Sequence, residues 1–251
     1  MKVKINGVEL YCELHGEGEP IIFLHGWLDD CTVWNPQVEP LIKKRKVISY
    51  DHRGHGRSDK PDCVYSVEVL ANDLYDLMQE LDIEESVIVG HSLGGMAALT
   101  FSLNHPDKIS RLVIVGTTAK TPFLMMAQAV LRYIIPYRTF VQLAQKSGYY
   151  KPSDQLIKNS LDMASSVPKY VAYSSLREFT RNYDLRNKVS KIQVPTLIVV
   201  GAKDENTPMA ASKYLNEQIG NSILRVIPDC GHEVMVEKPA EFGEVLSEFI
   251  E

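Results

Sequence analysis

The chain has 251 residues, of which 45% are hydrophobic and 24% are charged, and its formal net charge is −5. This length is sufficient for one or two domains with a sizeable buried core. The mildly acidic balance, with basic residues scattered along the chain, argues against a surface for nucleic acid or for an anionic membrane.

The cysteines and the apolar segments predict the compartment. Residues 1–7 lack the long apolar stretch of a signal peptide. The most apolar region, 123–137, is interrupted by Gln128 and Arg132 and is shorter than the roughly 20 apolar residues of a membrane span. The chain has four cysteines: Cys12, Cys31, Cys63 and Cys230. None of them form a Cys-x-x-Cys pair, which argues against a zinc site and a dense disulfide framework. We therefore expect a soluble cytoplasmic protein with reduced thiols.

The predicted elements begin with a hairpin whose turn is Asn6-Gly7, because both residues tolerate positive φ. Short apolar runs then alternate with helical patterns. The apolar runs are 21–24, 47–50, 87–89, 112–115, 197–200 and 223–227. The helical patterns lie near 65–81, 93–104, 208–219 and 239–250. Continuous apolar runs separated by helices predict an α/β fold with a mostly parallel sheet covered on both faces.

This alternation stops between about Thr118 and Ser190. The segment contains no clear strand pattern and carries Met, Tyr, Leu and Phe at helical spacing. We interpret residues 119–189 as a helical cap inserted after the sixth strand, with residues 1–118 and 190–251 forming the core. An insertion at the carboxyl end of a strand lies over the crevice where open α/β sheets bind ligands.

The sequence Gly90-His91-Ser92-Leu93-Gly94 follows a predicted strand and opens a predicted helix. In that context a Gly-x-Ser-x-Gly turn forces the serine into a strained conformation and projects its hydroxyl above the sheet edge. The helix N-terminus also directs unpaired N–H groups at the site. The alternative is a small-residue turn without catalytic function. We predict that Ser92 is a nucleophile.

A serine nucleophile needs a base, and the base needs an orienting acid. His232 follows the run 223–227, and Asp204 follows the run 197–200. Both therefore lie at carboxyl ends of parallel strands, on the same edge of the sheet as Ser92. We predict the triad Ser92, Asp204 and His232.

Other residues are weaker candidates for these roles. Glu205 is the nearest rival acid, and Asp51 and Asp59 are more remote ones. The remaining histidines occupy tight turns, a glycine-rich loop or surface-like contexts and are expected to be structural: His15, His25, His52, His55, His91 and His105.

An acyl-transfer site also needs donors for the developing oxyanion, and main-chain N–H groups supply them. One donor should be the amide of Leu93, next after the nucleophile. The other should come from the loop His25-Gly26-Trp27, which follows the third predicted strand.

Together these residues resemble the α/β-hydrolase superfamily over nearly the whole chain. The blocks that carry the resemblance are 23–27 with Trp34, 50–58, 90–94, 194–197 with Gly201 and Asp204, and 231–232 with 237–239. The His-Gly-Trp form is similar to cap-bearing carboxylesterases, lactonases and cofactor-free haloperoxidase-like enzymes. The resemblance implies an α/β-hydrolase fold, an oxyanion-hole amide from Trp27, and a chiefly structural role for the loop 51–58. Serine at position 92 differs from the aspartate of the dehalogenase and epoxide-hydrolase branches.

The predicted function is hydrolysis of carboxylic esters, without a cofactor or a metal. We expect a small, moderately hydrophobic ester as substrate, no nucleic-acid or membrane partner, and a monomer or homodimer. The substrate-binding candidates are Trp27, Phe123, Met126, Tyr133 and Tyr137. Two alternatives remain open: a C–C bond hydrolase or enol-lactonase with the same triad, and a slow ligand-sensing protein that keeps the fold.

Overall fold

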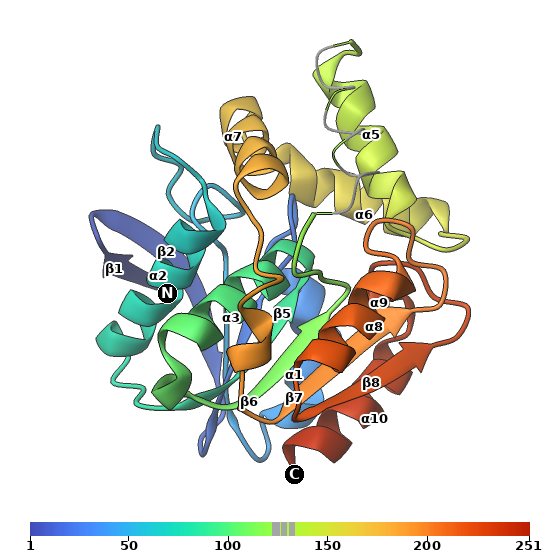
Figure 1. Ribbon diagram of the computed structural model, residues 1–251. Coiled ribbons are helices and arrows are strands. Elements are labelled where there is room, and N and C mark those ends of the chain that lie inside the picture. Colours follow the sequence, from blue (N-terminus) through green and yellow to red (C-terminus); the bar gives the residue numbers. More distant parts are fainter. Residues whose placement is uncertain (122–125, 127–129, 131–133) are drawn as a thin grey trace.

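A computed structural model describes residues 1–121, 126, 130 and 134–251. Its centre is an eight-stranded sheet with the order β1-β2-β4-β3-β5-β6-β7-β8 (Figure 1). The strands β3 to β8 run parallel, and β2 is antiparallel to both β1 and β4. The bounds are β1 (Lys2–Ile5), β2 (Val8–His15), β3 (Pro20–Leu24), β4 (Lys46–Tyr50), β5 (Ser86–His91), β6 (Ile109–Val115), β7 (Thr196–Gly201) and β8 (Ser222–Ile227). All six predicted apolar runs are strands.

The predicted hairpin is confirmed. Asn6 and Gly7 have φ values of 40° and 78°, and the strands on either side pair Ile5 with Val8. A two-residue turn with positive φ at both positions matches the twist of the strands that it joins.

Helices cover both faces of the sheet. The first group, α2, α3 and α8, contributes to one hydrophobic cluster, and the second, α1, α9 and α10, contributes to the other. Ile22 and Leu24 of β3 face the first cluster, whereas Ile21 and Phe23 face the second, as the two-residue period of a strand requires. The bounds are α1 (Asn35–Leu41), α2 (Val67–Glu80), α3 (Ser92–Asn104), α8 (Met209–Gln218), α9 (Val234–Glu237) and α10 (Pro239–Ile250).

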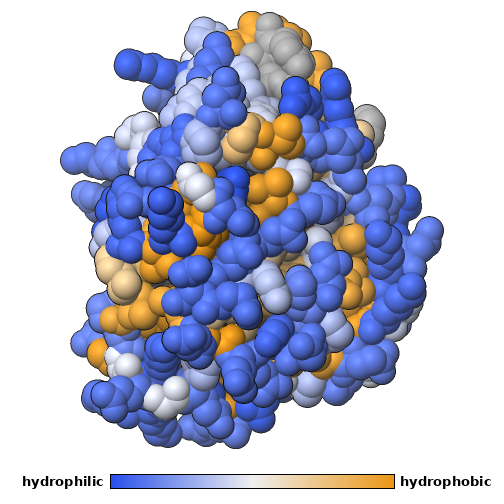
Figure 2. Space-filling model, turned by 90° about the vertical axis from the view of Figure 1, so that its left-hand side faces the viewer, coloured by the Kyte–Doolittle hydropathy of each residue, from blue (hydrophilic) through white to orange (hydrophobic). Residues whose placement is uncertain are grey.

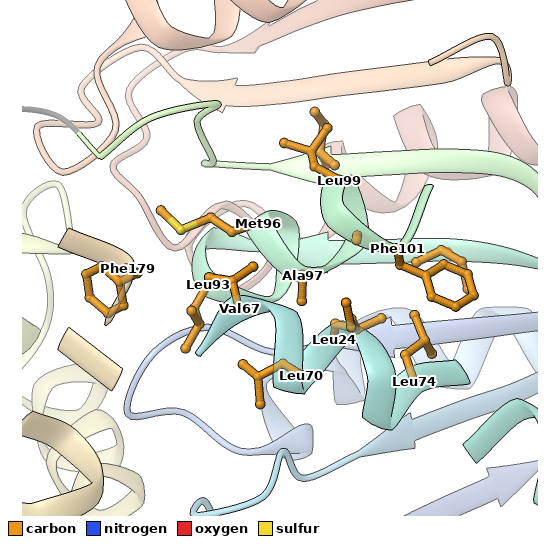
Figure 3. Packing of buried hydrophobic residues seen from close by; sticks show 14 of the residues in the cluster. Leu24, Val67, Leu70, Leu74, Leu93, Met96, Ala97, Leu99, Phe101 and Phe179 are labelled. Carbon is orange, nitrogen blue, oxygen red and sulfur yellow. The ribbon is translucent and has the colours of Figure 1, made fainter. Parts of the chain in front are cut away.

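Helix α2 shows how the local sequence produces this packing. The hydroxyl of Ser66 accepts a hydrogen bond from the amide of Val69 at 3.2 Å and caps the helix. Apolar residues then recur at helical spacing, and Leu70 and Leu74 lie against α3, whose Leu93 and Ala97 point toward them (Figure 3). The small side chains of α3 let the two helices lie close together on the sheet.

Among the described residues between β6 and β7, three α-helices follow one another: α5 (Tyr137–Ser147), α6 (Asp154–Ser165) and α7 (Lys169–Arg181). They sit together beyond one end of the sheet (Figure 1). Among the described residues of the segment, the only strand-like pairing is the bridge between Lys120 and Asp184. The indole of Trp27 joins this segment to the core, because its ring contacts Phe140 and Phe179 edge-on.

Hydrophilic side chains predominate on the face shown in Figure 2, and hydrophobic ones form separate patches between them. In the part of the chain that the structure describes, no helix has the length and apolar character needed to cross a membrane.

Two glycine variants test whether close backbone contact at the end of β7 is needed for folding. A Cβ on Gly201 would lie 1.9 Å from the carbonyl oxygen of Gly231, whereas a Cβ on Gly243, within α10, meets nothing within 4 Å. We expect Gly201→Ala to destabilise the fold, because two backbone segments must separate. Gly243→Ala should raise the free energy of unfolding by about 0.5–1 kcal/mol, because alanine has the better helix propensity. Urea denaturation measures both, and equal stability of the two variants would contradict the expectation.

Candidate active site

Ser92 lies at the junction of β5 and α3. Its φ is 49°, a left-handed conformation that a residue with a Cβ adopts only under constraint. Gly94 permits the sharp turn, since a Cβ there would lie 2.5 Å from the carbonyl oxygens of Leu24 and His25. The hydroxyl of Thr117 donates a hydrogen bond of 2.8 Å to the carbonyl oxygen of Ser92 and holds the turn from the end of β6. The turn predicted from sequence is therefore present.

Asp204 and His232 lie in the loops that follow β7 and β8. The Nδ1 atom of His232 is 2.8 Å from Oδ2 of Asp204. The carboxylate is held in place by Thr207, whose hydroxyl donates to Oδ2 at 2.7 Å and whose amide donates to Oδ1 at 2.8 Å. The amide of Asn206 also donates to Oδ1, at 2.9 Å. Asp204 thus accepts hydrogen bonds from four donors, the Nδ1–H of His232 among them.

The two side chains stabilise each other's charged form. Burial lowers the pKa of His232, but the charge and hydrogen bond of Asp204 outweigh burial and leave that pKa raised from 6.5. Burial raises the pKa of Asp204, and the charge of His232 with the hydrogen bonds of Thr207 reverses this and leaves that pKa lowered from 3.8. A proton taken up by the imidazole would therefore stay on the imidazole rather than pass to the carboxylate.

Ser92 and His232 share one pocket. Its interior holds about 60 Å³ of space for the centres of water-sized molecules. Its lining comes from the core loops and from α5: Trp27, Asp29, His91, Ser92, Ala144, Gln145, Ser147, Asn206, His232 and Glu233. The structure therefore brings the predicted nucleophile and the predicted base to one cavity, and the hydrogen bond described above ties the predicted acid to that base.

The predicted substrate-binding residues have separate locations. Trp27 lines the pocket, and its indole N–H donates to the hydroxyl of Ser175 at 3.0 Å. Tyr137 lines a different cavity, between α5 and α6, and its hydroxyl donates to the carbonyl oxygen of Val167 at 3.3 Å. Met126 is 38% exposed, and Phe123 and Tyr133 lie outside the described residues. A role in substrate binding stays a prediction for all five.

The two predicted oxyanion donors lie beside Ser92. Leu93 is in the first turn of α3. Trp27 comes shortly after Leu24 and His25, whose carbonyl oxygens lie close to Gly94. Because α3 begins at Ser92, its first amides are free of partners within the helix. Binding of an oxyanion by these amides stays a prediction.

Three residues near the site were not singled out from sequence. Thr207 binds the carboxylate of Asp204, and Asp29 and Glu233 are buried carboxyl groups that line the pocket. An Asp followed three positions later by Thr is a common turn motif and could have suggested Thr207. Asp29 and Glu233 carry no such local pattern, since only the fold brings them to His91.

The rival candidates have other partners. The carboxylate of Asp51 accepts from the amides of Cys31 at 2.8 Å and Arg57 at 2.7 Å, so it organises the loop 51–58. Asp59 accepts from the amide of Glu9 at 2.9 Å. Glu205 is exposed, while Asp204 makes the contact with the imidazole.

Three of the other histidines form a buried cluster behind the site. The rings of His25 and His52 are 4.3 Å apart and those of His25 and His55 are 5.2 Å apart. Nε2 of His25 accepts from the amide of His52, and its Nδ1 donates to the carbonyl oxygen of Gly26, which defines a neutral ring. Burial lowers the pKa of all three, that of His55 to about 4. A structural role stays the prediction for these three histidines.

A family model described as the alpha/beta hydrolase fold matches residues 19–239. The chain belongs to the α/β-hydrolase family. The predicted fold class is thereby confirmed, together with the eight-stranded, mostly parallel sheet flanked by helices.

Relatives within the family act on several substrates. The chain is 27% identical to 3-oxoadipate enol-lactonase 2 of Acinetobacter baylyi, covering 90% of this chain and 86% of that one. It is 28% identical to the AB hydrolase superfamily protein YisY of Bacillus subtilis, over 96% and 95% of the two chains. A solved structure of Est816, described as an N-acyl homoserine lactone degrading enzyme, superimposes with a TM-score of 0.90 at 30% identity, over 99% of this chain and 100% of that one.

Variants of Thr207 test how the acid is positioned. Thr207→Val removes the hydroxyl that donates to Asp204, and we expect kcat/KM for p-nitrophenyl acetate to fall about tenfold, the effect of losing roughly 1.4 kcal/mol. Thr207→Ser keeps the hydroxyl and should retain most of the activity. The pH profile should also shift in Thr207→Val, since the carboxylate that raises the pKa of His232 is less firmly held. Equal activity and equal profiles of the two variants would contradict this role.

The lowered pKa of His55 predicts that the stability difference between His55→Gln and the unmodified chain depends on pH. Below pH 6.5 the unfolded chain protonates His55 while the folded protein keeps it neutral, so His55 lowers the free energy of unfolding as the pH falls toward about 4. We expect His55→Gln to gain stability relative to the unmodified chain by up to about 1.4 kcal/mol per pH unit in this range.

Urea denaturation at pH 7, 6 and 5 measures that difference. The comparison between variants is needed because Asp29 and Glu233, whose pKa values are raised, act in the opposite direction over the same range. A difference that does not grow as the pH falls would show that His55 is not kept neutral.

Proposed function

We propose that the chain is a serine hydrolase that cleaves carboxylic esters through an acyl-enzyme on Ser92. The observation that carries this proposal is the 2.8 Å contact between His232 and Asp204 beside a pocket that also contains Ser92. Family membership supports hydrolytic chemistry, and two relatives are named for lactones, which are cyclic esters: an enol-lactonase and an N-acyl homoserine lactone degrading enzyme.

His232 acts as the base in this mechanism. Its Nδ1–H donates to Asp204, so the lone pair is on Nε2. Nε2 accepts the proton of the Ser92 hydroxyl as the serine oxygen attacks the ester carbonyl. Asp204 remains ionised and stabilises the imidazolium that forms, in agreement with its lowered pKa.

The tetrahedral intermediate carries its charge on the former carbonyl oxygen. In the proposal, the amides of Leu93 and Trp27 donate to this oxyanion, and the N-terminus of α3 adds a partial positive charge. The imidazolium then gives its proton to the departing alkoxide, and the alcohol leaves an acyl-serine. Water, deprotonated by His232, releases the acid and restores the free serine.

The dimensions of the pocket favour a short acyl group. One water molecule needs roughly 10–15 Å³ of such space, so 60 Å³ accommodates about four to six waters. Apart from Trp27 and Ala144, the lining side chains are polar or charged. We therefore propose an acyl group of a few carbons.

Substitution of the nucleophile tests the proposal. We expect Ser92→Ala to lower kcat/KM for p-nitrophenyl acetate by about 10⁴-fold or more, because no acyl-enzyme can form. Ser102→Ala is a matched control on the same helix, since Ser102 only donates to the carbonyl oxygen of Leu99 at 2.8 Å. The acyl adduct should be detected on Ser92 by mass spectrometry of the intact protein. Full activity of folded Ser92→Ala would refute the assignment.

A substrate panel determines the subclass. Activated esters of two to twelve carbons, a lactone and a meta-cleavage product should be compared under the same conditions. We expect the highest kcat/KM for acyl chains of two to four carbons, with a decline as the chain exceeds the pocket. Preference for long chains would contradict the size argument, and rapid turnover of the meta-cleavage product with feeble ester hydrolysis would favour C–C bond cleavage.

A further inference from the structure

Side-chain atoms of His91, Asp29 and Glu233 lie close together in the pocket that contains Ser92. Nδ1 of His91 is 3.8 Å from Oδ2 of Asp29 and 3.8 Å from Oε2 of Glu233. All three residues are buried, with 1%, 3% and 6% of their surfaces exposed. Neither Nδ1 of His91 nor Oε2 of Glu233 has a hydrogen-bond partner among the described residues. Buried polar atoms without partners are rare and point to a missing ligand.

The hydrogen bonds of the two imidazoles define which nitrogen is free on each. Nε2 of His91 lies 3.1 Å from the carbonyl oxygen of His232, which can only accept, so Nε2 carries the proton and Nδ1 has the lone pair. Nδ1 of His232 donates to Asp204, so its lone pair is on Nε2. One ligand atom from each of His91, His232 and Glu233 lies within 4.8 Å of the other two.

This arrangement has the features of a metal site. Each imidazole donates its single N–H to a carbonyl or carboxylate oxygen and keeps its other nitrogen free, which is the support that metal-binding histidines commonly have. Two imidazole nitrogens and one carboxylate are a ligand set typical of Zn²⁺, whereas Mg²⁺ and Ca²⁺ prefer oxygen ligands alone. Asp29 adds a carboxyl group next to His91. A Cβ on Gly26 would lie 2.6 Å from Oδ2 of Asp29 and 2.7 Å from Nδ1 of His91, so only glycine leaves this space free.

We propose that His91, His232 and Glu233 bind Zn²⁺ through Nδ1, Nε2 and a carboxylate oxygen, and that bound Zn²⁺ inhibits the enzyme. Zinc ligands at about 2.0–2.2 Å from a tetrahedral ion lie roughly 3.4 Å apart, so the side chains close by up to about 1.4 Å on binding. The inhibitory part rests on the proposed function, because the ion occupies the Nε2 lone pair that would accept the proton of Ser92. Binding itself does not depend on that function.

Calorimetry on Ser92→Ala tests binding without catalysis. This variant keeps all three ligands, and we expect one Zn²⁺ per chain and no binding of Mg²⁺. Glu233→Gln and His91→Gln should each weaken Zn²⁺ affinity about 10- to 100-fold, whereas Glu205→Gln, an exposed carboxylate outside the cluster, should not. Circular dichroism confirms that each variant is folded. No stoichiometric binding, or unchanged affinity in both ligand variants, overturns the site.

Inhibition is measured separately on the unmodified chain. We expect stoichiometric Zn²⁺ to reduce turnover of p-nitrophenyl acetate at least tenfold and EDTA to restore it. In Glu233→Gln, inhibition should require 10- to 100-fold more Zn²⁺, compared with the metal-free rate of that variant. Bound Zn²⁺ without loss of turnover overturns the inhibitory assignment. A chain that binds Zn²⁺ but hydrolyses no substrate of the panel contradicts the proposed function and leaves the metal site supported.

Discussion

The parallel alignment of β5, β7 and β8 is the constraint on which the candidate site depends. Parallel strands have their carboxyl ends at one edge of the sheet, so the loops that follow them meet there. Ser92, Asp204 and His232 each come directly after one of these strands, although 140 residues of sequence separate the first from the last. In an antiparallel sheet the same loops would alternate between opposite edges.

The helices between β6 and β7 complete the pocket that the sheet begins. Ala144, Gln145 and Ser147 of α5 line it opposite the core loops. The end of α5 also holds the loop of the candidate base, since the carbonyl oxygen of Gly148 accepts from the amide of His232 at 2.7 Å. Movement of this segment would therefore change both the shape of the pocket and the position of the imidazole.

Burial gives the charged groups of the site their properties. The pKa of Asp204 is lowered because the charge of His232 and four hydrogen-bond donors, its Nδ1–H among them, outweigh the cost of burial. Asp29 has the backbone hydrogen bond of Gly26 and the charge of His232 to offset burial, but burial outweighs both and raises its pKa to about 7. Burial also raises the pKa of Glu233 well above 4.5. Buried carboxyl groups in and around one site thus favour opposite protonation states.

Sequence alone determined the strands, four of the six core helices (α2, α3, α8 and α10) and the order of Ser92, Asp204 and His232 along the chain, because these depend on local patterns and on the order of the strands. Apolar runs define strands through burial, and the Gly-x-Ser-x-Gly turn defines its own geometry through backbone sterics.

Tertiary structure decided which side chains surround those three. Asp29 and Glu233 are 204 positions apart, and only the folded loops bring both to His91. Cysteine spacing argues against a zinc site built from cysteines. It gives no information about histidines and carboxylates that the fold brings together from distant loops. The pocket could not be predicted from sequence either. Its small volume depends on how α5 packs over the sheet, and no local sequence pattern specifies that packing.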